Sequence, residues 1–363
     1  MRLRRIAVVA ALAALLPVVV SYWGTMSEPS NSSLGIRSVE WLRDHGAAGL
    51  VARVESVYYS LTAPSKGGPT LHALPRVGDG TGSPAAPAVN IEDRPARVVS
   101  LLRPGLPGEG VWHTTRPGLK AEPPVLVTTL RDQPEYPRAV AGLAWINTKR
   151  TTLTLNPGRL EPSVQIPRGS MDVPSTDRPR LLATFNSGFK LSDSRGGFAV
   201  NGHTYSQLRD GQGTLVGYGD GRVDVVDWHY GSTLPPGVSF ARQNLPLIVE
   251  AGRPSPNIAN DAEWGATVGN AVLVWRSAVG VDKHGNLIYA AGEDQSVGSL
   301  ADTLAHAGAV RAMELDINSY WVSFITYGAP GAQAPVNLLS GMERPATRYL
   351  TPDDRDFFAV YSR

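Results

Sequence analysis

Two acidic side chains and one amide alternate with apolar residues near the C-terminal end of the chain. Within residues 312–318, the polar positions are Glu314, Asp316 and Asn318. On a β-strand, this alternation places the three polar side chains on one face, with Glu314 and Asp316 roughly 6.6 Å apart along the strand. Two carboxylates at that spacing can flank one small ligand group and divide acid and base roles between them. The pattern predicts either a solvated strand face or a cleft lined by paired carboxylates.

Polar residues also interrupt three other apolar segments. Asn186 ends a strand-like run, and Gly188 permits a close approach of another backbone. Arg276 lies in an otherwise apolar strand-like segment, where its guanidinium is a permanent cation with several donors. Glu293 and Asp294 come shortly before a helix-like segment. Each residue also has an ordinary explanation as a turn or surface residue, so the hypothesis of a site rests on their joint occurrence.

Short β-favouring runs between turn residues predict the elements that position these side chains. We expect strands over Val125–Leu130 and over residues 140–147 and 151–155. Asn-Gly, Asp-Gly and His-Gly-Asn turns farther along predict hairpins. One helix is predicted to begin at the capping-box-like residues 299–302 and to end at Gly308. This order predicts an α+β fold of largely antiparallel, mixed sheets with a few packed helices.

The N-terminal residues are typical of an export signal. Three arginines within the first five residues precede the uncharged apolar run 6–20. The run is short for a membrane span, and no clean cleavage site follows it, so removal as a signal peptide and retention as a membrane anchor both stay open. We therefore expect an extracytoplasmic protein, either secreted or anchored by this segment, with membrane contact through the N-terminal segment only.

Two further segments precede the β-rich region. Residues 38–59 predict a pair of short helices, or one helix broken at Gly46 and Gly49. The Pro/Gly-rich residues 64–87 predict an exposed linker. The expected parts of the chain are a signal or anchor (1–22), a helical and Pro/Gly-rich region (23–120) and the β-rich domain (121–363).

Composition narrows the chemistry. The 363 residues carry 34 basic and 32 acidic side chains, so the formal net charge of +2 gives no electrostatic argument for a nucleic-acid partner. The chain has no cysteine, which excludes disulfides, thiol nucleophiles, zinc–thiolate sites and iron–sulfur clusters. We expect no metal site and no cofactor, with a divalent cation as the alternative.

Five short motifs occur in an order that resembles the phosphodiester glycosidase family. The resemblance extends from about Val125 to the C-terminus. It implies an exported glycoside hydrolase that releases a sugar from a phosphodiester-linked glycan of the cell-envelope type. The motifs are Asn186-x-Gly188-Phe189, Arg276-x-Ala278-x-Gly280, Gly285-x-Leu287, Gly298-x-Leu300 and Leu315-Asp316.

The resemblance and the strand pattern together suggest catalytic roles. Asp316 is expected to stabilise or attack the oxocarbenium-like state of the sugar. Glu314 is its acid/base partner on strand geometry alone. Arg276 can bind a phosphodiester oxygen through its fork of donors. His203 is a further candidate for proton transfer, although a histidine in a hairpin turn is commonly just exposed.

Other residues are predicted to contact the sugar or its phosphate. Asn186 and Asn318 would orient hydroxyl groups. After its Leu-Asp pair the family has a glycine-rich turn and a serine, whereas this chain has Tyr320 and Trp321 in the same region, and these aromatic rings could stack on a sugar. The predicted substrate-binding residues are Asn186, Gly188, Phe189, His203, Glu293, Asp294, Asn318, Tyr320 and Trp321.

Three other functions stay open at this stage. A non-catalytic exported module could bind envelope glycans through the aromatic pair, and a structural envelope protein could recruit a partner through residues 38–59. A metal-dependent phosphodiesterase would need hard oxygen ligands for calcium or magnesium. The side chains available for that purpose are Asp294, Glu314, Asp316 and Asn318.

Overall fold

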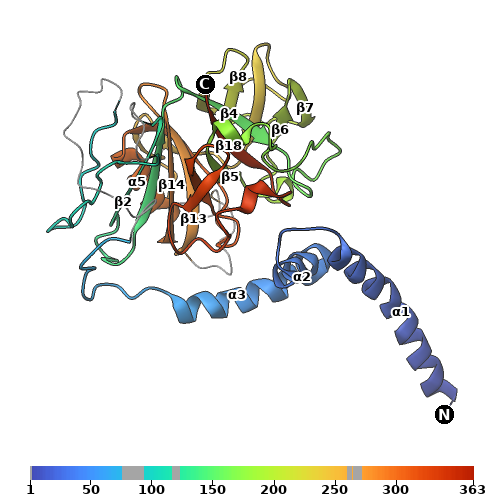
Figure 1. Cartoon of the computed structure of the whole chain (residues 1–363). Helices are drawn as coiled ribbons and strands as arrows, with labels where there is room; N and C mark the ends of the chain where they lie inside the picture. Colours follow the sequence, from blue (N-terminus) through green and yellow to red (C-terminus); the bar gives the residue numbers. More distant parts are fainter. Residues whose placement is uncertain (1, 76–93, 117–122, 260–263, 265–271) are drawn as a thin grey trace.

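A computed structural model describes residues 2–75, 94–116, 123–259, 264 and 272–363. Its strands form three sheets, and every strand pairing among the described residues is antiparallel. Few helices accompany the sheets (Figure 1). The predicted α+β fold is therefore confirmed, while the proposed domain boundaries stay a prediction.

The largest sheet has eight strands and contains most of the predicted site residues. Its strand order is β1-β2-β3-β14-β13-β15-β11-β12. Nearly all of its central strands are buried on both faces, which explains their almost continuous apolar sequences. The strands are β1 (His113–Thr114), β2 (Val125–Leu130), β3 (Ala141–Ile146), β11 (Leu247–Glu250), β12 (Arg253–Pro254), β13 (Val274–Asp282), β14 (Leu287–Gln295) and β15 (Ala309–Glu314).

Two five-stranded sheets complete the β structure. One has the order β17-β16-β5-β18-β4 and brings the C-terminal strand into its interior, between strands from the middle of the chain. Its strands are β4 (Thr151–Asn156), β5 (Leu181–Asn186), β16 (Phe324–Ala329), β17 (Gln333–Asn337) and β18 (Phe357–Ser362).

The other five-stranded sheet has the order β7-β6-β10-β8-β9. It carries the predicted Asn-Gly and Asp-Gly hairpin turns between β6 and β7 and between β8 and β9. Its strands are β6 (Phe198–Val200), β7 (His203–Ser206), β8 (Gly213–Tyr218), β9 (Val223–Asp227) and β10 (Val238–Gln243).

Each face of the large sheet packs against a different layer. Val127 and Tyr289 belong to a core shared with strands of both small sheets, including Phe185 and Phe240. On the opposite face, side chains such as Ile288 pack against helix α5 (Val297–His306). The large sheet is thus the central layer, and burial on both faces fixes its register, because a slip by one residue would exchange the two cores.

Strands β3 and β4 match the predicted limits to within one residue at each end, and two larger differences concern β15 and α5. Strand β15 ends at Glu314, and the chain continues in an irregular extended form through Asp316. Helix α5 begins three residues earlier than predicted, because Ser296 is the N-cap and Ser299 completes its capping box as the third helical residue. The predicted end is right, since Gly308 has a left-handed φ of 98°.

The N-terminal residues form a helical arm that projects from the β structure (Figure 1). Helix α1 (Arg2–Ser27) is followed by α2 (Leu34–Leu42), a π-turn (Arg43–Ala47) and α3 (Ala48–Thr62). The predicted break at Gly46 is present, with a φ of 88°, whereas Gly49 lies inside α3. Among the described residues, no helix combines the length and apolarity that a membrane crossing requires. The second half of the predicted linker, residues 76–87, lies outside the described residues.

Candidate functional site

The ends of three strands bring Arg276 and Glu314 together in the interior. Arg276 lies near the start of β13 and Glu314 at the end of the neighbouring strand β15. The Nη1 of Arg276 donates to Oε1 of Glu314 at 2.6 Å, and its Nε donates to the carbonyl of Gln295 in β14 at 3.0 Å. Both side chains are at most 2% exposed. The two residues therefore form a buried ion pair, and the solvated strand face expected as one alternative is wrong.

Asp316 forms a second buried pair directly after the strand. Its Oδ2 accepts from Nη2 of Arg355 at 2.7 Å, and its Oδ1 accepts from the backbone N–H of Asn318 at 3.0 Å. The backbone of Asp316 is also fixed, because its N–H donates to the carbonyl of Ser187 and its carbonyl accepts from Oγ of Ser277. Two carboxylates two residues apart are thus each held by an arginine.

Burial dominates the electrostatics of these carboxylates. Desolvation raises the pKa of Glu314 to about 7, although Arg276 opposes the rise and the nearby charge of Asp316 adds to it. Burial also raises the pKa of Asp316, and the charge of Arg355 is the main opposing influence. At neutral pH, Glu314 can therefore hold a proton beside a carboxylate that is ion-paired.

Two buried polar atoms in this region have no hydrogen-bond partner. They are Oε2 of Glu314 and Oγ of Ser187. Buried polar groups without partners are uncommon in folded proteins and call for an explanation such as a ligand or a catalytic role. These atoms mark the part of the cluster where a polar group of a substrate could bind.

Asn186 connects the strands that converge on the cluster. Its Nδ2 donates to Oγ of Ser277 at 3.0 Å, while its Oδ1 accepts from the hydroxyl of Tyr289 at 2.9 Å and from the backbone N–H of Ser323 at 3.0 Å. It is 2% exposed. The structure thus brings Asn186 to the site as a bridge between two sheets, with its side-chain groups already in use.

Gly188 and Phe189 line the same region through their backbones. The Gly188 carbonyl accepts from Nη2 of Arg355 at 3.2 Å. A Cβ atom at Gly188 would lie 3.1 Å from the side chain of Asn244, so any larger residue would press against Asn244. The N–H of Phe189 donates to Oδ1 of Asn244 at 3.2 Å, so the segment is pinned beside Asp316 and Arg355.

The aromatic pair is close to the cluster but does not form an open platform. Tyr320 is 9% exposed and Trp321 is 4% exposed. The guanidinium of Arg344 lies 4.6 Å from the ring centre of Tyr320, and those of Arg348 and Arg355 lie 5.3 and 5.2 Å from the ring of Trp321. Arginines already pack against both rings here, so stacking of these rings on a sugar stays a prediction.

Asn318 shapes the turn that carries these rings. Its Oδ1 accepts from the backbone N–H of Tyr320 at 3.0 Å, and its carbonyl accepts from Trp321 and Val322. Together with the bond from its own N–H to Asp316, this makes Asn318 a turn-forming residue next to the site.

The N-terminal arm crosses the same region. The backbone N–H of Ser33 donates to the hydroxyl of Tyr320 at 2.9 Å, and Glu40 of helix α2 pairs with Lys190. Glu40 lies near enough to Arg355 and Asp316 to interact with their charges. Residues 28–44, which we call the N-terminal strap, therefore lie over the candidate site.

Hydrogen bonds hold the strap to the segment before the last strand. Ser32 Oγ donates to Oδ2 of Asp354 at 2.7 Å, and Asn31 Nδ2 donates to Oδ2 of Asp353 at 3.0 Å. Arg344 donates to Oδ1 of Asn31 at 2.8 Å. The strap is thus docked by specific polar contacts rather than by apolar burial.

Three predicted residues are not brought into this cluster. His203 is exposed at the start of β7, an edge strand of a different sheet. Glu293 is exposed near the end of β14, and Asp294, with a φ of 59°, has a pKa that burial, with a smaller contribution from Glu293, raises to about 6. In the part of the chain that the structure describes, none of these three side chains bonds to Glu314 or Asp316, so they stay predictions as substrate-binding groups.

Sequence reasoning missed the arginines and aspartates that surround Asp316. Arg348 donates to Oδ2 of Asp353 at 2.8 Å and to the carbonyl of Trp321 at 2.8 Å, with no exposed side-chain surface on either partner of the ion pair. The detectable signal is the charged run 353–356 directly before the apolar strand β18. Charged residues are rarely buried unless they are paired, so such a run next to a core strand indicates a buried network.

The described residues do not contain a group of three or more histidine, aspartate or glutamate side chains arranged to hold a metal ion. The acidic oxygens of Glu314 and Asp316 instead contact Arg276 and Arg355. A divalent cation therefore stays an alternative, but the described part of the chain offers no cluster of side chains to bind it.

Comparisons with known proteins give distant structural similarity only. No family model and no curated protein sequence matches the chain. Among solved structures, the chain is similar to the zebrafish N-acetylglucosamine-1-phosphodiester alpha-N-acetylglucosaminidase catalytic domain, auto-inhibited by pro-peptide. The identity is 14%, the TM-score is 0.45, and the match covers 68% of this chain and 85% of that chain.

Two bacterial structures are also similar. A hypothetical protein from Synechocystis matches with 14% identity and a TM-score of 0.38, over 67% of this chain and 64% of that chain. A protein described as exported, from Burkholderia pseudomallei, matches with 12% identity and a TM-score of 0.36, over 63% of this chain and 75% of that chain. These values indicate a distant structural relationship and no specific function.

Proposed function

We propose that the chain is an exported glycoside hydrolase that releases a sugar from a phosphodiester-linked glycan. The observation that carries this proposal is the pair of carboxylates, Glu314 and Asp316, held two residues apart by separate buried arginines. The ordered motifs that resemble phosphodiester glycosidases end at Asp316 and so point to the same cluster. Export is suggested by the basic and apolar N-terminal residues.

In this proposal, Asp316 and Glu314 divide the work of one hydrolysis. The bond between the anomeric carbon and the phosphate oxygen breaks, and its electron pair stays on that oxygen. Asp316, ionised beside Arg355, stabilises the positive charge that develops on the sugar. Glu314, whose pKa of about 7 lets it hold a proton, gives that proton to the leaving oxygen and takes one back from the attacking water. The products are a free sugar and a phosphate monoester.

The arginines would bind the anionic part of the substrate. Arg355 has five N–H donors and uses Nη2 for both Asp316 and Gly188, so other donors are available to a phosphate oxygen. Lys190 lies near Arg355, because both interact with Glu40. A substrate phosphate in this position would replace the carboxylate of Glu40.

Access to this cluster requires movement of the N-terminal strap. Asp316 is 5% exposed and Glu314 is fully buried, so a sugar cannot reach them while Glu40 and Ser33 keep their contacts. The contacts that hold the strap are hydrogen bonds and ion pairs, and several of them are buried, such as the bond from Ser32 to Asp354, so displacement requires these polar groups to find new partners. Displacement of residues 28–44 is therefore part of the proposed function.

The test is release of reducing sugar from an α-glycosyl phosphodiester by the purified full-length chain and its Asp316→Asn variant. We expect the variant to lose at least a hundredfold in turnover while it keeps its binding of substrate. The matched control is Asp224→Asn. Asp224 lies on β9, pairs with Arg311 and is outside the carboxylate cluster. Equal sugar release by wild type and Asp316→Asn would refute the proposal.

A glycan-binding module without catalysis receives less support from the geometry. The aromatic pair on which such a module would depend is buried, with arginines against its rings. The unpartnered Oε2 of Glu314 and Oγ of Ser187 favour a site that handles a polar group in the interior. Glycan binding that survives loss of Asp316, without any sugar release, would restore the binding-module alternative.

A further inference from the structure

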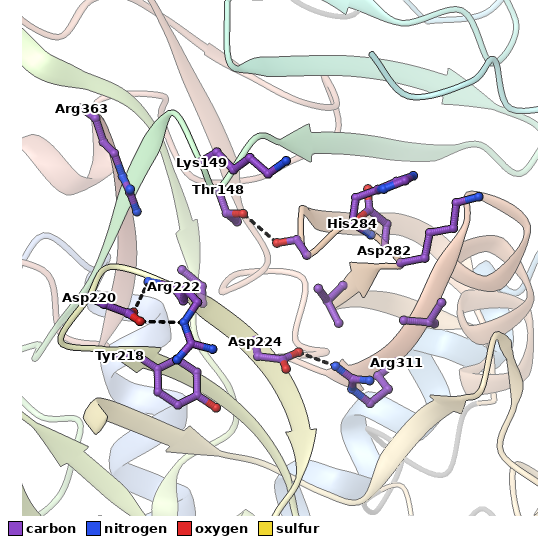
Figure 2. Close-up of a pocket in the computed structure, with 15 residues that line it drawn as sticks. Thr148, Lys149, Tyr218, Asp220, Arg222, Asp224, Asp282, His284, Arg311 and Arg363 are labelled. Carbon is purple, nitrogen blue, oxygen red and sulfur yellow. Dashed lines mark hydrogen bonds and ion pairs between the residues drawn. The ribbon is translucent and has the colours of Figure 1, made fainter. Parts of the chain in front are cut away.

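A cavity lies at the end of the large sheet that is opposite to the carboxylate cluster. Its volume is about 520 Å³, and it is surrounded by the β8–β9 and β13–β14 hairpin turns and by the connection from β3 to β4 (Figure 2). Asp282, at the end of β13, lines it, whereas Arg276 lies near the start of the same strand. Six residues of β-strand span roughly 20 Å, so the cavity is separate from the candidate site.

Basic side chains outnumber acidic ones around this cavity. Five lysine and arginine residues line it together with His284, against three aspartates. All of these cations come from different turns or strand ends, which the fold brings together. The basic residues are Lys149, Arg222, Lys283, Arg311 and Arg363, and the acidic residues are Asp220, Asp224 and Asp282.

Each of the three aspartates already has partners. Asp220 pairs with Arg222 at 2.7 Å, and Asp224 pairs with Arg311 at 2.7 Å (Figure 2). Asp282 accepts from the backbone N–H groups of His284 and Asn286 at 2.8 and 2.9 Å, which closes its own hairpin turn. The acidic groups are therefore occupied within the protein.

Three cations around the cavity have no carboxylate partner. Arg363 donates to the carbonyls of Thr151 and Gly221 at 2.8 and 2.7 Å. Among the described residues, no acidic side chain pairs with the exposed Lys149 or Lys283. These groups leave an uncompensated positive potential over a concave surface, which favours an anionic ligand.

We propose that this cavity binds an organic phosphate, with the phosphate between Lys149 and Lys283. A lysine ammonium is a compact point charge that suits a phosphate oxygen. The cavity is within the size range of small-molecule sites and has room for more than a bare phosphate ion. Tyr218, Thr148 and Arg222 line the remaining space and offer an aromatic edge and polar groups to the attached moiety. The proposal does not depend on the proposed hydrolase function.

The test is calorimetric titration of the full-length protein, in a mild non-ionic detergent, with glucose 1-phosphate. We expect the Lys149→Gln/Lys283→Gln double variant to bind it at least tenfold more weakly. The matched control is Arg209→Gln/Arg253→Gln, which removes two exposed cations outside the cavity and should change the affinity less than twofold. The Asp316→Asn variant should bind like wild type, because Asp316 belongs to the other site.

Titrations with glucose and with inorganic phosphate show which part of glucose 1-phosphate the cavity binds. Glucose alone should not bind, and inorganic phosphate should bind more weakly than the ester. Equal affinity of inorganic phosphate and glucose 1-phosphate would overturn the assignment to an organic phosphate. Equal losses in the lysine and arginine double variants, or a loss in Asp316→Asn, would overturn the assignment to this cavity. Affinity should also fall as salt is raised, since exposed charges are screened.

Discussion

Replacement of Glu314 by glutamine should change how the stability of the protein depends on pH. The carboxyl group of Glu314 is fully buried, and burial raises its pKa from the ordinary 4.5 to about 7. A folded-state pKa above the unfolded value means that the folded protein binds the proton more tightly. The stability that this group contributes is therefore present at low pH and is lost as the pH rises toward and through 7.

The size of the effect follows from the displacement of the pKa. Between pH 5 and pH 8, ionisation of Glu314 should lower the free energy of unfolding of the wild type by about 2–3 kcal/mol, since each unit of displacement corresponds to about 1.4 kcal/mol. Glutamine has a similar shape, can still accept from Arg276 and does not titrate. The stability of Glu314→Gln relative to wild type should therefore rise by about 2–3 kcal/mol over this range.

Urea unfolding at pH 5, 6, 7 and 8 measures this difference. Asp132 also has a pKa raised by burial, to about 6, but it titrates in both proteins and cancels in the comparison. The control is Glu343→Gln, which changes an exposed glutamate away from Glu314 and should track the wild type at every pH. A constant difference between Glu314→Gln and wild type across the range would refute the reasoning.

Three more changes test the fold and the strap. Asn186→Ala should lower the free energy of unfolding by about 2–3 kcal/mol in urea titrations, because the hydroxyl of Tyr289 loses a buried acceptor. Gly142→Ala should cost about 1–3 kcal/mol by overpacking, since the new Cβ would lie 2.9 Å from Leu338. If sugar release is found, Glu40→Gln should raise turnover several-fold by weakening the contact with Lys190; unchanged turnover would show that the strap does not limit access.

Local sequence signals were sufficient for much of the fold. Strand β2 has the predicted limits, because Val125–Leu130 consists of β-favouring residues, follows two prolines and is buried throughout. The helix break at Gly46 and the helix end at Gly308 are right, since both positions need a left-handed backbone. The order of strands within the three sheets was not predictable, because pairing joins segments such as β3 and β14 that are far apart in the sequence.

The candidate site could be predicted only in part. The charges of Glu314 and Asp316 interact, although the predicted strand ends at Glu314, and Arg276 contacts Glu314 from the neighbouring strand. Arg355, which holds Asp316, comes from the segment before the C-terminal strand, and nothing local links the two positions. The covering strap was also unpredictable, since its contacts are single polar bonds to residues about 300 positions away.

The buried ion pairs argue for a functional cluster rather than a stabilising one. Removal of charges from water is costly, and a buried pair is often no more stabilising than apolar residues of similar size. This cluster contains two such pairs, and Oε2 of Glu314 and Oγ of Ser187 have no hydrogen-bond partner. The cost of burying these two atoms is therefore not offset by hydrogen bonds. Conflicts between local chemistry and stability are expected at sites that carry function. The polar interior around Asp316 is therefore the region where the chemistry of this protein should be sought first.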